Sequence, residues 1–160
     1  MPYQAKKTLI SLVSSLIILV LYITNILPQI GTLTTISDWA KIMLVHIGLG
    51  AIITIVLHII FHIYLSVSIA IKERDKDDKA IERSINQEMV EDEMTKLIDL
   101  KSLQVGYIVT GIGFVSGLVL LSIGYNMILV LNIMFLSFFI GSVIEGLVNI
   151  FFNLKGVHNG

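Results

Sequence analysis

The fold is decided by residues 102–144, SLQVGYIVTGIGFVSGLVLLSIGYNMILVLNIMFLSFFIGSVI, a stretch without any charged residue. As a single helix it would be about 65 Å long, roughly twice the 30 Å core of a bilayer. The chain therefore has to turn back within it. The tripeptide GYN at 124–126 is the turn signal, because glycine and asparagine tolerate left-handed backbone. We predict a third membrane span over about 103–123 and a fourth over about 127–153.

Two further runs without charge precede this stretch. Residues 9–27 form the first and end at Pro28. The run is longer than the roughly 7–15 apolar residues of a signal peptide, so we predict a retained first span instead. Residues 42–71 form the second, which would be about 45 Å long as a helix. Such a helix exceeds the bilayer core and is expected to tilt or to project beyond it.

The composition supports an all-α integral membrane four-helix bundle. Hydrophobic residues make up 55% of the 160 residues and charged residues 14%; soluble domains average about 25% charged. Most of the charge falls in residues 72–101, which hold seven basic and ten acidic residues. We therefore predict a single membrane domain over 1–160, with the lipid bilayer as its surroundings and residues 72–101 as a segment outside the bilayer.

The distribution of Lys and Arg predicts the orientation. Lys6 and Lys7 precede the first span, seven basic residues lie in 72–101, and Lys155 follows the fourth span. The loop between the first two spans carries only Lys41. Because basic residues favour the cytoplasmic side, we expect a multi-pass protein of the cell membrane with both termini cytoplasmic.

The segment between the second and third spans has helical periodicity. Ile81, Ile85 and Met89 follow one another at intervals of four, which predicts an amphipathic cytoplasmic helix. Its apolar stripe could lie on the membrane, pair with another copy or pack on a soluble partner. In the simplest alternative, spans two and three only extend outward as a helical hairpin.

The candidate site is a set of polar residues inside the spans, where ionisable groups are costly. Glu145 is the one acid within any predicted span. Measured along its helix from the outer face of the membrane, Glu145 lies at a depth of about 27 Å. His58 and His62 lie at depths of about 24 and 30 Å from the same face. Asn149 continues the Glu145 face at i+4. We expect a Glu145, His58, His62 and Asn149 cluster, which is either a proton relay or cation site or a structural pair.

The histidines also permit weaker interpretations. The His58-x3-His62 spacing is compatible with one metal ion or a haem, but two ligands are too few for a stable metal site. We therefore expect no metal and no cofactor. His46 lies near the predicted outer end of the second span, where interfacial water could solvate it.

The third span carries small residues at helical spacing. Gly106, Gly113 and Gly117 are candidates for helix packing, since small-x3-small patterns let two helices approach closely. Packing within the bundle is the more common use of such a pattern than dimerisation.

Several classes of function are excluded by what the sequence lacks. There is no cysteine, so disulfides, thiolate nucleophiles and Cys-based metal sites are excluded. No nucleotide-binding loop, HExxH motif or Ser/His/Asp order occurs. The net charge is −1 and no basic patch favours nucleic acid. We expect a protein that is not an enzyme and does not bind nucleic acid.

Residues 91–102, EDEMTKLIDLKS, run into VGYI at 105–108. This stretch resembles a D-E-R-D-x-x-I-x-x-K-S pattern in small bacterial membrane proteins that carry a domain of unknown function, with paired spans on either side of the motif. Met94 and Thr95 stand where that pattern has Arg-Asp. The resemblance implies a protein of the bacterial inner membrane, from a Gram-positive source, and it implies no activity.

These observations favour a multi-pass membrane protein without enzymatic activity, acting as a regulatory, immunity or accessory subunit through helix contacts. Its partner would be another membrane protein or a second copy of the chain. The alternative is an oligomeric proton- or cation-coupled small transporter with Glu145 as the coupling acid. Metal or haem binding through His58 and His62 is the weaker alternative.

Overall fold

The computed structural model describes residues 3–29, 35–72 and 93–155, and the regular structure in these ranges is entirely helical. Four long helices are present, and a short 3-10 helix, η1 (Leu27–Gln29), follows the first. The long helices are α1 (Tyr3–Ile26), α2 (Ile36–Lys72), α4 (Glu93–Ser122) and α5 (Met127–Lys155). Each is long and apolar enough to cross a membrane. The prediction of an all-helical chain with four candidate spans is confirmed.

The turn between α4 and α5 lies where the sequence predicts it. Gly124 has a φ of +88°, the left-handed conformation that side chains other than glycine avoid. The Asn126 Oδ1 accepts the backbone N–H of Ile128 at 2.8 Å and caps the start of α5. The α2 helix is capped in the same way by Thr35, whose Oγ1 accepts the N–H of Asp38 at 3.2 Å. Local side-chain chemistry therefore defines both of these helix starts.

The α4 helix starts before the predicted third span, in agreement with the alternative in which that span extends outward as a helix. The helix begins at Glu93, ten residues before the predicted span, so Lys96 and Asp99 belong to the same continuous helix as the apolar stretch. Lys96 and Asp99 are spaced i and i+3, which is compatible with a helix. Because both are charged, they lie outside the apolar run from which hydropathy defines the span. The predicted amphipathic helix with Ile81, Ile85 and Met89 lies outside the described residues.

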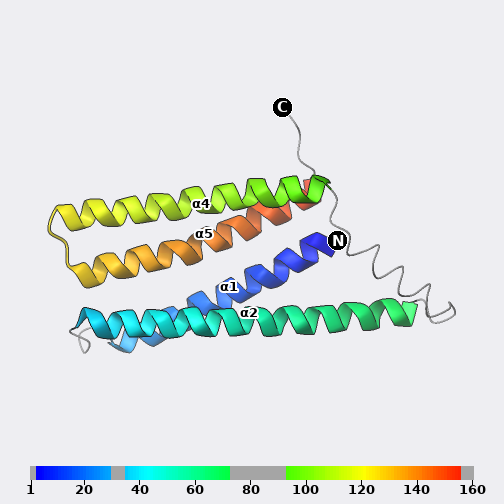
Figure 1. Cartoon of the computed structure of the whole chain (residues 1–160), viewed down its shortest axis with the longest axis horizontal. Coiled ribbons are helices and arrows are strands. Elements are labelled where there is room, and N and C mark those ends of the chain that lie inside the picture. The colour runs from blue at the N-terminus through cyan, green and yellow to red at the C-terminus, as the bar shows by residue number, and fades with distance from the viewer. Residues whose placement is uncertain (1–2, 30–34, 73–92, 156–160) are drawn as a thin grey trace.

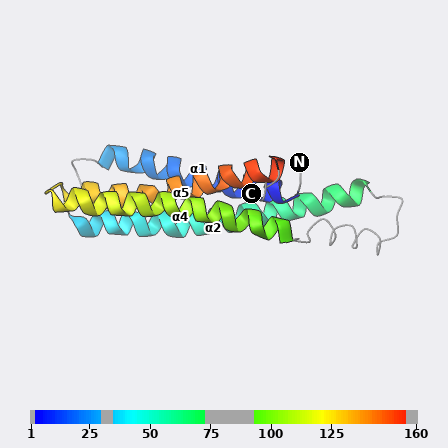
Figure 2. The ribbon, with the colours of Figure 1, turned by 90° about the horizontal axis from the view of Figure 1, so that it is seen from above.

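The four helices run alternately up and down, so α1 and α4 begin, and α2 and α5 end, at the same end of the molecule (Figure 1). We call this the amino end. Helix α4 packs along α5, α5 packs on α1, and α1 packs on α2. Helix α2 contacts α5 only slightly, and Figure 2 shows the four helices lying along a common axis. The described helices thus form a bundle that stays open between α2 and α4.

The opposite end of the bundle is held by an aromatic cluster around Tyr22. This side chain is fully buried, and its hydroxyl donates to Asn132 Oδ1 at 2.6 Å, which links α1 to α5. The His46 ring of α2 lies edge-on to Tyr22 with centroids 5.0 Å apart. The expectation that interfacial water solvates His46 is wrong, because this side chain is only 3% exposed and packs inside the protein.

The contact between α4 and α5 depends on glycine. A Cβ added to Gly117 would lie 2.6 Å from Met134 Cγ, and one added to Gly113 would overlap the side chain of Ser137. A Cβ on Gly106 would lie 2.8 Å from the Cβ of Glu145. All three glycines named in the sequence analysis therefore face α5 at distances that only glycine permits.

We predict that Gly113→Leu or Gly117→Leu lowers the stability of the bundle by about 3 kcal/mol, the upper end of typical overpacking effects. Val115→Leu is the matched control, since Val115 is 57% exposed on the same helix. The measurement is the melting temperature in detergent. Equal melting temperatures for all three variants would contradict the close α4–α5 contact.

Candidate functional site

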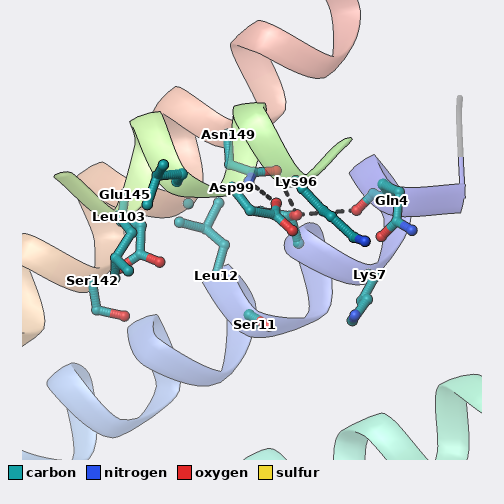
Figure 3. Close-up of a pocket in the computed structure, with 13 residues that line it drawn as sticks. Gln4, Lys7, Ser11, Leu12, Lys96, Asp99, Leu103, Ser142, Glu145 and Asn149 are labelled. Atoms are coloured by element: carbon teal, nitrogen blue, oxygen red, sulfur yellow. Dashed lines mark hydrogen bonds between the residues drawn. The ribbon is translucent and has the colours of Figure 1, made fainter. Parts of the chain in front are cut away.

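A cavity of about 480 Å³ opens at the amino end between α1, α4 and α5. We call it the amino-end cavity, and Figure 3 shows the side chains around it. Leu12, Leu100 and Leu103 contribute apolar surface. Its polar and charged lining residues are Gln4, Lys7, Thr8, Ser11, Lys96, Asp99, Ser142, Glu145 and Asn149.

Asn149 connects the three helices that form this cavity. Its Nδ2 donates to Asp99 Oδ1 of α4 at 2.7 Å, and its Oδ1 accepts from Thr8 Oγ1 of α1 at 2.7 Å. Asn153, one turn further along α5, donates to the same Oδ1 at 2.8 Å. Asn149 is only 6% exposed. Its amide therefore uses both its donor and its acceptor to join α1 and α4 to α5.

Glu145 lies one turn deeper on α5 and lines the same cavity. A Cβ placed on Gly106 would be 3.1 Å from Glu145 Oε2, so the carboxylate lies over the glycine of the neighbouring helix. Among the described residues, no hydrogen bond or ion pair reaches this carboxylate. Asp99 is close enough to act on it electrostatically. Glu145 is half-buried beside another acid and lacks a compensating partner within the described ranges.

Gln4 is a second polar side chain with unused hydrogen-bonding capacity in this cavity. It is 9% exposed, and its Nε2 has no hydrogen-bond partner in the described structure. Lys7 and Lys96 bring positive charge to the same lining. The cavity lining therefore combines the Gln4 amide and two cations with the carboxylates of Asp99 and Glu145. Such a lining can hold a charged or zwitterionic group.

The structure does not pair His58 directly with Glu145. The His58 Nδ1 lies 2.8 Å from the backbone carbonyl oxygen of Thr54, which can only accept, so this nitrogen carries the proton. Its Nε2 then accepts from Ser11 Oγ on α1 at 3.2 Å. Both ring nitrogens are thus engaged. Ser11 and Glu145 line the same cavity, so His58 is bonded to one of its lining residues and not to Glu145 itself.

His62 lies one turn further along α2, on the exposed surface of that helix, with its ring 5.7 Å from the ring of Phe61. Within the described ranges, no three His, Asp or Glu side chains gather closely enough to hold a metal ion. Of the four residues predicted to cluster, the structure brings Glu145 and Asn149 to one cavity. It attaches His58 to the edge of that cavity and leaves His62 on the outer side of α2.

Helix α1 and the first turns of α4 contribute lining residues that were not predicted from the sequence. Thr8, Gln4 and Asp99 line the cavity, but Asp99 was assigned to the cytoplasmic segment and the other two lie in a run of ordinary polar residues. One signal was available for Asp99. Asp99, Ser102 and Gly106 follow one another at intervals of three and four residues, so they share one face of α4. Gly106 on this face contacts α5.

We predict that Asn149→Leu destabilises the bundle by about 1–2 kcal/mol, because two interhelical hydrogen bonds are lost and each contributes about 0.6–1.7 kcal/mol in membranes. Asn153→Leu is the control, since its hydrogen bonds stay within α5. Unfolding by titration with sodium dodecyl sulfate measures both. Identical midpoints for the two variants would show that Asn149 does not hold the helices together.

Comparisons with protein-family models, with curated proteins and with solved structures find no match to this chain.

Proposed function

We propose that the chain is a non-enzymatic, multi-pass protein of the bacterial cell membrane, which acts as a regulatory or accessory subunit by binding a helix of another membrane protein. The single observation that carries this proposal is the open side of α2. This helix packs on α1, touches α5 slightly and hardly touches α4. Within the described ranges, no other helix packs closely on the remaining faces of α2.

One ridge of α2 has the features of a helix-binding surface. Leu44 and Ile52 are 67% and 60% exposed, and Gly48 lies between them at intervals of four. A Cβ added to Gly48 would meet nothing within 4 Å, in contrast to Gly106, Gly113 and Gly117 of α4. A glycine between two large apolar residues lets a partner helix approach its backbone closely. We call Leu44, Gly48 and Ile52 the α2 ridge.

A photoreactive amino acid at Ile52 should yield one discrete protein adduct in native membranes. The same group at Val115, 57% exposed on α4, should yield lipid adducts alone. Adding Gly48→Leu should abolish the protein adduct formed from position 52. It should not lower the melting temperature, because the added side chain has open space around it. An adduct of twice the chain's mass would identify a second copy as the partner instead. Lipid adducts from both positions would contradict the proposal.

The proposed orientation places both termini and the segment after α2 in the cytoplasm. It rests on the charge distribution, since Lys6, Lys7, Lys96 and Lys155 belong to the amino end and Lys41 to the opposite end. A reporter fused after Asn159 should be active only if it is a cytoplasmic reporter. Activity of an exported reporter at the same position would reverse the topology.

The transporter alternative is favoured by one observation, namely the Glu145 carboxylate without a partner in the described part of the bundle. Four helices enclose little space, so transport would require at least a dimer. Metal or haem binding through His58 and His62 is not supported, because both His58 nitrogens already have protein partners.

A further inference from the structure

A second cavity, of about 410 Å³, lies along the seam between α4 and α5. We call it the seam slot. It shares Leu103, Ser142 and Glu145 with the amino-end cavity and continues from there along the helices.

The chemistry of the slot differs from that of its neighbour. Glu145 provides the one charged side chain in its lining, and Tyr107, Phe114 and Phe138 provide three aromatic rings. These rings are 78%, 48% and 58% exposed, so the described chain leaves much of their surface uncovered. Aromatic faces attract cations, most strongly where water is excluded.

Glycines bring the carboxylate and the rings together. Gly106 and Gly141 allow the backbones of α4 and α5 to approach, because a Cβ on Gly141 would lie 2.8 Å from the carbonyl oxygen of Gly106. The Glu145 carboxylate then lies over Gly106, at the wall of the slot. Gly111, another lining residue, would meet nothing within 4 Å if it carried a Cβ, so the slot has free room beside the aromatic rings.

We propose that the seam slot binds an amphiphilic organic cation, in which an ammonium or comparable onium group pairs with Glu145 and the apolar part lies against Tyr107, Phe114 and Phe138. This goes beyond the helix-contact function and does not depend on it. An uncompensated carboxylate in an apolar slot is unfavourable, and a cation with an apolar body removes that penalty while covering the aromatic surface. An anionic lipid would meet repulsion from Glu145. A bare metal ion would find a single carboxylate, too few ligands for Ca²⁺ or Zn²⁺.

The test is equilibrium binding of radiolabelled tetraphenylphosphonium to the purified protein in the non-ionic detergent dodecyl maltoside. We expect saturable binding by the wild type and at least a tenfold weaker affinity for Glu145→Gln. Glu93→Gln is the matched control, because it removes an exposed acid in the first turn of α4, away from the slot, and should change the affinity less than twofold. Tetraphenylborate, an anion of the same shape, should not show saturable binding.

The aromatic side of the slot is tested separately, which keeps the proposal testable if Glu145→Gln does not fold. Phe138→Leu should weaken binding several-fold with the carboxylate intact. Phe151→Leu, which alters an exposed ring of the same helix outside the slot lining, should leave it unchanged. Equal affinities of the wild type and Glu145→Gln, or equally tight binding of tetraphenylborate, would overturn the proposal.

Two sources could supply such a cation, and competition separates them. If phosphatidylethanolamine added to the micelles displaces tetraphenylphosphonium and phosphatidylglycerol does not, the occupant is an amine-bearing lipid. If neither displaces it while the dependence on Glu145 holds, the occupant is a free organic cation.

Discussion

The close approach of α4 and α5 is the constraint on which the rest of the structure depends. Without side chains at Gly106 and Gly141 the two backbones come into contact, and Gly113 and Gly117 leave room for the side chains of Ser137 and Met134. Such contacts gain dispersion energy in a bilayer, where no hydrophobic effect drives helices together. The same approach leaves Glu145 against the backbone of α4 and makes it a shared wall of two cavities. The position of the acid is thus a consequence of helix packing.

The remaining helices are joined to this pair by polar contacts at several levels. At the amino end, Asn149 forms hydrogen bonds with Thr8 of α1 and Asp99 of α4. Nearer the middle, the hydroxyls of Ser15 and Ser142 lie 2.9 Å apart, and Tyr22 and Asn132 form the next link. Helix α1 is therefore tied to α5 along its length. Helix α2 depends on α1 for most of its packing, which explains why the bundle remains open beside it.

The sequence could predict the number of helices and the turn at 124–126, because charge-free runs and turn residues leave few alternatives. It could also predict that Gly106, Gly113 and Gly117 face another helix, although not which one. The pairing of His58 with Glu145 rested on equal depth, and depth does not fix which way a helix is rotated. The structure turns His58 toward Ser11 of α1. Asp99 was predicted to lie in the segment outside the bilayer, and the structure adds that this part of the segment belongs to the first turns of α4.

The central claim is that Glu145 faces a polar cavity formed by α1, α4 and α5 rather than lipid. Because the chain has no cysteine, single cysteines can be introduced without further changes. The most direct measurement compares Glu145→Cys with Leu147→Cys, two residues along α5, where Leu147 is 53% exposed. In liposomes, a water-soluble cationic methanethiosulfonate reagent should modify the cysteine at 145 through the amino-end cavity and leave that at 147 unmodified. Modification at 147 with none at 145 would contradict the account.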